Sequence, residues 1–299
     1  MAASASSTIS SRTSTSSSTS DGLLARVAAA IRLVHPFPSV LDGVVVAAVA
    51  LVAGAAPMLA LHLGLSMTAL QCSIGALNDI HDAPEDAGRK PGKPIPAGLV
   101  SAPFARSVAV GGAAVGVVLA ALVDARVGVL AVVVLAIGYG YDVAAKGTAW
   151  SWLPFAVGIP ILPVYGWLGG SSGLPDFFVA LVPISVLAGA ALAIANARAD
   201  VERDLASGTV SVATRFGLQG SWRTQAFLWL ATALVALAWL VFRGAEPIRV
   251  GLFLAAAGLI AGLVLWSRHR GPAARELAWE FEAVATALAL LIWLAAVVR

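Results

Sequence analysis

The chain has 299 residues, of which 59% are hydrophobic and only 12% are charged, and its mean hydropathy is +0.89. Soluble domains carry about 25% charged residues, so this composition excludes an ordinary soluble protein and indicates a membrane protein. The net charge of +3 reflects the loops between apolar segments and does not point to a nucleic-acid partner.

Residues 1–21 are predicted to form a disordered tail in front of a single membrane domain, residues 22–299. The tail is Ser/Thr-rich and of low complexity, so it cannot bury enough apolar surface to fold. It lacks the apolar region of a signal peptide, although a Ser-rich organellar transit peptide stays open as an alternative. The next segment, GLLARVAAAIRLV, predicts a short helix on the membrane surface that ends at the prolines of HPFP.

Apolar runs of about 20 residues then recur to the end of the chain, and each can cross a hydrocarbon core of about 30 Å. Because lipid offers no hydrogen-bond partners to open strands, these spans must be helices. The sequence therefore predicts an all-α, polytopic membrane protein with nine transmembrane helices. Their approximate ranges are 39–57, 58–78, 101–123, 127–145, 152–169, 177–197, 224–242, 248–267 and 278–298.

The charges between these spans predict the orientation of the chain. With the N-terminus in the cytoplasm, fifteen of the 19 lysines and arginines fall on the cytoplasmic side. Only Arg126, Arg243, Arg249 and Arg299 fall outside. The positive-inside rule favours this topology, and an odd number of spans leaves the C-terminus external. The expected location is a bacterial-type plasma membrane.

Two acidic stretches repeat one pattern at the ends of predicted spans. The second span runs into NDIHDAPED (78–86) and the sixth into NARADVERD (196–204), and both open on the cytoplasmic side. Both fit N-x-x-x-D-x-x-x-D, and a spacing of four places each trio on one face of a helix that prolongs its span. Acids near a helix C-terminus oppose the helix dipole, so another interaction must favour them there. The two trios are Asn78, Asp82, Asp86 and Asn196, Asp200, Asp204.

The residue types in and around these stretches predict a metal-dependent diphosphate site. Carboxylate and amide oxygens suit Mg²⁺, which is typically shared between one or two carboxylates and a substrate phosphate. No His/Cys cluster indicates zinc, and no P-loop pattern is present. Cations that can hold oxyanions lie close by, at Arg89, Lys90, Lys93, Arg198, Arg203 and Arg215. A diphosphate at the mouth of an apolar helix bundle suggests a lipid diphosphate.

These residues resemble the UbiA superfamily of intramembrane prenyltransferases, over roughly residues 22–298. The most similar parts are NDIHDAPED with the downstream KPIPAG, and DVERD with the downstream GTVSVATRFG. QCSIGALND and YDVAAKGTAWSWLP, the latter like the family's Tyr…Lys segment, add to the likeness. The resemblance implies nine helices around a central cavity, with both Asp-rich motifs at its cytoplasmic mouth. It also implies Mg²⁺-dependent ionisation of an isoprenoid diphosphate.

The resemblance also implies roles for individual residues. Asn78, Asp82, Asp86, Asp200 and Asp204 are expected to hold the metal, together with Asn196 from the repeated pattern, while Lys93 and Lys146 contact diphosphate oxygens. Arg89, Arg198 and Arg203 are further candidates for binding the diphosphate. Asp82, Asp200, Lys146 and Tyr141 are the candidate catalytic residues.

Several positions depart from the family's pattern. Pro84 interrupts the first motif, and a helix that ends there would displace Asp86. Gly147 and Thr209 stand where a basic residue is common. In HPFPS, His35 stands where Arg is common and Ser39 where Asn is common. These departures affect the inference about the acceptor more than the inference about the metal site.

Ionisation of an allylic diphosphate leaves a cation that needs a negative π face and protection from water. The candidates are Tyr139, Tyr141, Tyr165 and Trp167, with Tyr141 favoured by its place in the Tyr…Lys segment. The predicted function is transfer of a prenyl group to an acceptor, expected to be aromatic, within the bilayer. A terpene cyclase that acts on the same diphosphate remains an alternative. An ion-coupled transporter is less favoured, because its acids would lie nearer mid-membrane.

Overall fold

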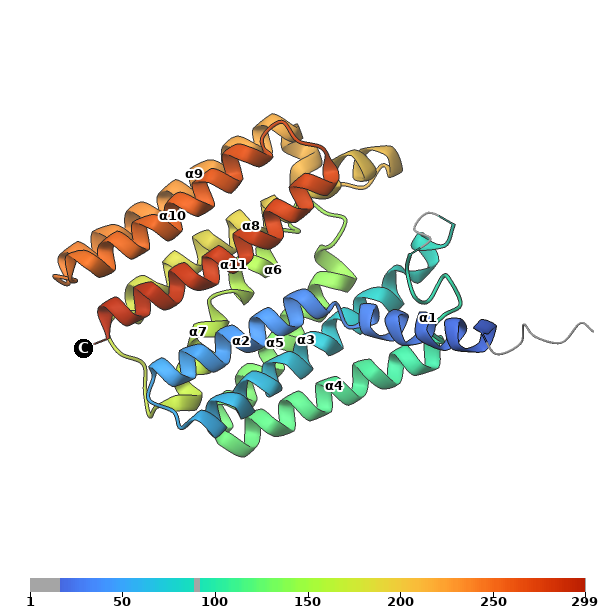
Figure 1. Cartoon of the computed structure of the whole chain (residues 1–299), viewed down its shortest axis with the longest axis horizontal. Coiled ribbons are helices and arrows are strands. Elements are labelled where there is room, and N and C mark those ends of the chain that lie inside the picture. Colours follow the sequence, from blue (N-terminus) through green and yellow to red (C-terminus); the bar gives the residue numbers. More distant parts are fainter. Residues whose placement is uncertain (1–16, 89–91, 299) are drawn as a thin grey trace, which may run out of the picture.

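The computed structural model describes residues 17–88 and 92–298, and every regular element among them is a helix (Figure 1). A short π-helix, η1, continues helix α5. The predicted all-α fold is confirmed. In chain order the elements are α1 (Ser17–Leu33), α2 (Pro36–Val52), α3 (Pro57–Asp86), α4 (Ala102–Val123), α5 (Ala125–Gly140), η1 (Tyr141–Ala145), α6 (Leu153–Gly158), α7 (Ile161–Gly170), α8 (Phe178–Ser207), α9 (Val212–Phe242), α10 (Pro247–Ser267) and α11 (Pro272–Val297).

Eight helical segments of the described chain are long and apolar enough to cross a membrane. Among them, α5 with η1 counts as one segment, and α6 with α7 as another. The pair Gly22–Leu33 and Pro36–Val52, bent by 50°, passes the same test as one further span. The predicted count of nine spans agrees with this larger number.

The N-terminal region follows the prediction only in part. Helix α1 begins at Ser17, so it includes the last residues of the segment expected to be a tail, and residues 1–16 lie outside the described part of the chain. The helix ends at Leu33, and His35 then adopts a left-handed conformation with φ 47°. Pro36 starts α2 directly afterwards, at a position where a missing N–H removes no helical hydrogen bond.

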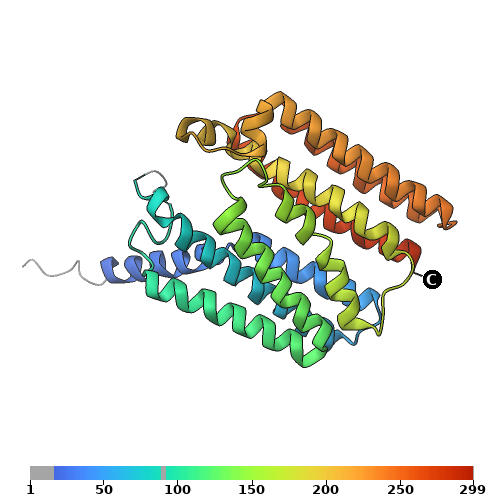
Figure 2. The ribbon, with the colours of Figure 1, turned by 180° about the vertical axis from the view of Figure 1, so that it is seen from behind.

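The helices run side by side, with α4 at one edge and the α9–α10 pair at the opposite edge in both views (Figures 1 and 2). Helix α2 packs against α3 and α7, and α8 packs against α9 and α11. Glycines bring α2 and α3 close together. A Cβ atom on Gly43 would lie 2.7 Å from the Gly64 carbonyl oxygen, and one on Gly64 would lie 2.8 Å from that of Gly43. Such close backbone contact is typical of membrane helices.

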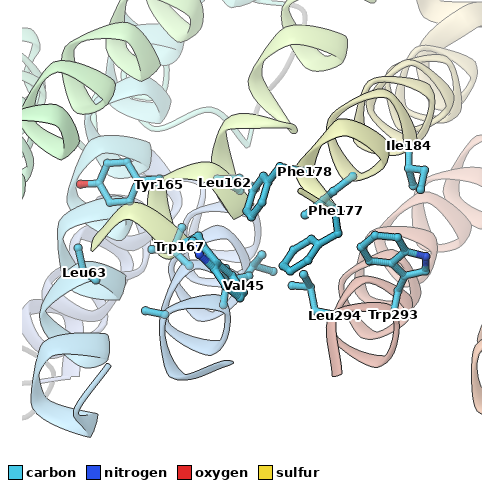
Figure 3. Packing of buried hydrophobic residues seen from close by; sticks show 14 of the residues in the cluster. Val45, Leu63, Leu162, Tyr165, Trp167, Phe177, Phe178, Ile184, Trp293 and Leu294 are labelled. Carbon is cyan, nitrogen blue, oxygen red and sulfur yellow. The ribbon is translucent and has the colours of Figure 1, made fainter. Parts of the chain in front are cut away.

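The hydrophobic core joins the two halves of the bundle, and Figure 3 shows part of it. Val45 of α2 and Leu63 of α3 face residues of α7, while Trp293 of α11 completes the cluster on the other side. The rings of Trp167 and Phe177 meet edge to face, with their centroids 5.1 Å apart. This cluster lies toward the end of the bundle that carries the C-terminus.

The other end, on the right in Figure 1, carries both acidic motifs and is called the motif end below. It includes the described residues that follow α3, η1 and α8, which are 87–88, 92–101, 146–152 and 208–211. Glu85 at the end of α3 and Gly208 after α8 line one shallow pocket, so the two motif helices finish side by side. This arrangement is what the duplicated pattern predicted.

Labelling can test which side of the membrane the motif end faces. In a Cys72→Ala background, Ser172→Cys places a thiol in the exposed loop between α7 and α8, and Ser207→Cys places one at the motif end. In bacterial spheroplasts a membrane-impermeant maleimide is expected to label position 172 at once and position 207 only after permeabilisation. The reverse pattern would overturn the predicted orientation.

Candidate active site

A cavity of about 510 Å³ lies inside the motif end and brings the two acidic motifs together. Asn78 and Asp82 of α3 line it from one side, and Asn196 and Asp200 of α8 from the other. Other sequence-predicted site residues that line the same cavity are Lys93, Tyr141, Lys146 and Arg203. Eight of the predicted site residues, separated by up to 125 positions in the chain, thus share one cavity (Asn78 to Arg203).

The motif residues reach the cavity because their helices extend beyond the apolar spans. Helix α3 continues through Pro84 to Asp86, so the proline does not end the helix early. Asn78 and Asp82, one turn apart, therefore share the cavity-facing side of α3. Asp86 is buried instead near Lys93, whose Nζ atom lies 4.0 Å from Oδ2 of Asp86. In the second motif, Asp204 is half-buried and is not part of the cavity wall.

Each carboxylate that the two motifs place on the cavity contacts a cation. Lys146 donates a hydrogen bond to Asp82, and Arg203 donates one to Asp200 at 2.6 Å. Lys93 instead donates to Oδ1 of Asp79, at 2.5 Å. Since acids and bases alternate around the cavity, the same wall can bind both a divalent cation and an oxyanion.

Two buried acids support the site without having been assigned to it from the sequence. Asp79 accepts hydrogen bonds from Lys93 and from His35, the latter at 3.0 Å, so it fixes both basic groups at the cavity. Asp142 accepts a hydrogen bond from Asn78 at 2.8 Å and thereby orients that amide. The sequence signals were the clustering of acids in NDIHDAPED and the place of Asp142 inside the Tyr…Lys segment.

The π-helix η1 explains how this segment reaches the cavity. The backbone N–H of Lys146 donates to the carbonyl oxygen of Tyr141 at 2.8 Å, five residues earlier. This wider turn places Tyr141, Asp142 and Lys146 on the cavity wall together. Single π-turns of this kind occur frequently at functional sites.

The donors on the cavity wall fit Mg²⁺. They are the carboxylate oxygens of Asp82 and Asp200 and the amide oxygens of Asn78 and Asn196, which are the hard ligands this ion prefers. Within the described residues no three His, Cys, Asp or Glu side chains converge tightly enough to enclose a metal alone. Mg²⁺ needs no such enclosure, because it usually keeps waters and takes further oxygens from a substrate phosphate.

One of the candidate diphosphate-binding arginines, Arg198, is not among the described residues that line the cavity. Arg198 is buried, and its Nη1 atom donates to Oε1 of Gln225 at 2.6 Å, away from the cavity residues. Gln225 in turn donates to buried Glu282 at 2.8 Å, so the network ties α8 to α9 and α11. Arg198 therefore belongs to this buried network and not to the cavity wall. Arg89 lies outside the described residues.

Arg198→Met tests whether Arg198 acts in this network or in ligand binding. Removing Arg198 leaves Gln225 without its donor and buried Glu282 without the nearby positive charge, so we expect the free energy of unfolding to fall by roughly 3 kcal/mol. Binding of a prenyl diphosphate analogue by the folded protein should change less than about twofold. Thermal unfolding in detergent and calorimetry measure the two effects. If the variant keeps its stability but no longer binds the analogue, Arg198 is a ligand-binding residue after all.

Among the four aromatic candidates only Tyr141 lines the cavity. The hydroxyl groups of Tyr139 and Tyr165 hydrogen-bond serines of α3, and Trp167 packs in the hydrophobic core. These three aromatic residues therefore lie off the cavity wall, in the packing positions that the sequence also allowed for them. Two aromatic residues that it missed, Phe155 and Trp279, also line the cavity, and Phe155 meets Tyr141 edge to face at 5.9 Å.

A second cavity, of about 380 Å³, adjoins the first. It runs between α2 and the helices α7 to α11, and its wall is almost entirely apolar. The two cavities share Asp42, Ile159 and Leu162 as wall residues. The site therefore has a charged compartment at the motif end and an apolar compartment deeper in the bundle, which suits an amphiphilic ligand.

An all-helical membrane bundle with joined charged and apolar cavities defines a class of protein that binds amphiphilic molecules within the bilayer. A model of the UbiA prenyltransferase family matches residues 40–294, so the chain belongs to that family. No curated protein sequence matches the chain significantly.

Solved structures of the same fold include a digeranylgeranylglyceryl phosphate synthase, with a TM-score of 0.69 and 16% identity over 93% of this chain and 99% of that one. A UbiA homologue from Archaeoglobus fulgidus bound to DMAPP and Mg²⁺ gives a TM-score of 0.69 at 18% identity, covering 90% of this chain and 98% of that one. A UbiA homologue from Aeropyrum pernix gives 0.66 at 18% identity, with coverages of 86% and 95%.

Proposed function

We propose that the protein transfers a prenyl group from an isoprenoid diphosphate to an acceptor within the membrane, releases diphosphate and depends on Mg²⁺. The observation that carries this proposal is the single charged cavity on which Asp82 of the first motif and Asp200 of the second lie with Lys93 and Lys146. The A. fulgidus homologue has been solved with DMAPP and with GPP, each together with Mg²⁺, which supports the assignment of the ligands.

The donor's diphosphate would bind in the charged cavity, with Asn78, Asp82, Asn196 and Asp200 as the residues that hold Mg²⁺. When bound, Mg²⁺ neutralises the charge that develops on the leaving diphosphate. Its binding would compete with the contact between Asp82 and Lys146, which leaves that ammonium group able to contact diphosphate oxygens.

The apolar end of the donor would extend toward the second cavity. The allylic cation formed on ionisation would lie near the faces of Tyr141, Phe155 and Trp279, whose π systems stabilise positive charge. The surrounding helices exclude bulk water, which would otherwise capture the cation. Asp86 and Asp204 lie outside the cavity wall and are not among these metal-holding residues.

Product analysis tests the proposal. Purified protein in lipid nanodiscs would be incubated with Mg²⁺ and dimethylallyl, geranyl, farnesyl or geranylgeranyl diphosphate, each with and without a panel of phenols and aromatic acids. We expect diphosphate release and a prenylated acceptor. A cyclised hydrocarbon formed without acceptor would favour the cyclase alternative, and no diphosphate release from any donor would contradict the proposal.

A further inference from the structure

Asp42 is an ionisable residue for which the proposed reaction has so far no role. It lies on α2, well inside the helix, and is one of the three residues that line both cavities. Within the described part of the chain it is the one charged side chain on the wall of the apolar cavity. A carboxyl group in an apolar membrane bundle is costly, and its presence points to a binding or catalytic role.

The hydrogen bonds of Asp42 leave room for a ligand. Gln71 of α3 donates to Oδ2 of Asp42 at 2.7 Å, and Gln71 itself lines the charged cavity. No described residue donates to the other oxygen, Oδ1. This oxygen is nevertheless not fully buried. Oδ1 is therefore accessible from the cavity and can accept a hydrogen bond from a bound molecule.

The backbone around Asp42 fixes this oxygen in place. The next residue, Gly43, makes the close contact with Gly64 that holds α2 against α3. Asp42 therefore lies on a closely packed helix pair, and its side chain accepts a hydrogen bond from Gln71 of the neighbouring helix. A purely structural role as an interhelical hydrogen bond would need only Oδ2.

We propose that Asp42 binds the hydroxyl group of a neutral prenyl acceptor, such as a phenol or an alcohol with an apolar body. This inference rests on the proposed function and names the substrate class for the second reactant. The hydroxyl group donates to Oδ1 of Asp42, and the apolar body lies against the wall shared by Ile159 and Leu162. An acceptor with a carboxylate at this position is disfavoured, because two negative charges would meet in an environment of low polarity.

Binding of two matched probes, with naphthalene as a third and unsubstituted reference, tests the proposal. 2-Naphthol and 2-naphthoate differ only in the group that would face Asp42. The full-length protein would be placed in nanodiscs and saturated with geranyl thiolodiphosphate and Mg²⁺. Each probe would then be titrated into it by calorimetry. Wild type should bind 2-naphthol at least tenfold more tightly than 2-naphthoate, and also more tightly than naphthalene. Equal affinity of the wild-type protein for all three probes, or no binding of 2-naphthol to it, would by itself overturn the proposal.

Asp42→Asn keeps an oxygen that can accept from Gln71 while it removes the charge. We expect the affinity for 2-naphthol to fall roughly tenfold, the affinity for 2-naphthoate to stay equal or rise, and the melting temperature to stay near that of wild type. Asp176→Asn, in an exposed ion pair with Arg243 at the opposite end, is the matched control and should change neither affinity. A lower melting temperature with equal loss for both probes would show a structural role only.

The binding of geranyl thiolodiphosphate itself, measured beforehand in wild type and in both variants, keeps the two proposals apart. If that analogue does not bind to wild type, the proposed function fails. If it binds and the naphthol preference is absent, only the assignment of Asp42 fails.

Discussion

Asp200→Asn is expected to lower turnover roughly a hundredfold or more, which is the scale for losing one preorganised electrostatic stabiliser. Asp200 lines the charged cavity together with Asn78 and Asp82 of the first motif. Its ion pair with Arg203 is about half exposed and joins residues three apart on one helix, so its loss should change stability by less than about 0.5 kcal/mol. Diphosphate release from the best donor and thermal unfolding measure the two quantities.

Asp176→Asn is again the matched control, because Asp176 also pairs with an arginine at 2.6 Å but lies at the other end of the bundle. Its turnover should equal that of wild type. Glu202→Gln is less suitable, because Glu202 pairs with buried Arg275 and its loss would disturb the packing of α8 against α11. Near-wild-type turnover of Asp200→Asn would remove the second motif from the site.

Asp82→Asn should show an equally large loss of turnover and a reversal in binding. With Mg²⁺ present, the variant should bind a prenyl diphosphate analogue more weakly than wild type, because a metal ligand is missing. In EDTA it should bind at least as tightly as wild type, because one repelling charge is gone and Lys146 has lost the acid it contacts. Calorimetry under both conditions measures the reversal.

Glu85→Gln controls for the charge of the first motif, since Glu85 is exposed and is not part of the charged cavity. It should leave both affinities within about twofold of wild type. Weaker binding of Asp82→Asn in EDTA as well as in Mg²⁺ would contradict a metal-binding role, because the carboxylate would then act by holding Lys146 in place.

Helical periodicity accounts for what could be predicted from the sequence at the acidic motifs. A spacing of four placed Asn78 with Asp82, and Asn196 with Asp200, on common helix faces, and the structure brings both pairs to one cavity. The same geometry explains why Arg198 is not on the cavity wall. This residue is two positions from both Asn196 and Asp200, about 200° around the helix, so it points into the protein on the other side.

The remaining features depend on contacts between elements that are distant in the chain. Burial of Asp142 beside Asn78 follows from a π-turn, which no local pattern in YDVAAK predicted. Tyr165 and Trp167 were also candidates for the π face, and only the packing of α7 shows that they face the core. The sequence also could not show that α3 continues past Pro84 to Asp86, because a proline in this position can either end a helix or lie within it.

The most direct test of the two-motif site is the binding of a prenyl diphosphate analogue with and without divalent metal. Wild-type protein in nanodiscs would be titrated with geranyl thiolodiphosphate by calorimetry, first in Mg²⁺ and then in EDTA. Because Asp82 and Asp200 repel a diphosphate unless a metal ion lies between them, affinity should fall at least a hundredfold in EDTA and return when Mg²⁺ is restored. Equal affinity in EDTA would mean that Lys93, Lys146 and Arg203 alone hold the diphosphate, and it would contradict the metal site.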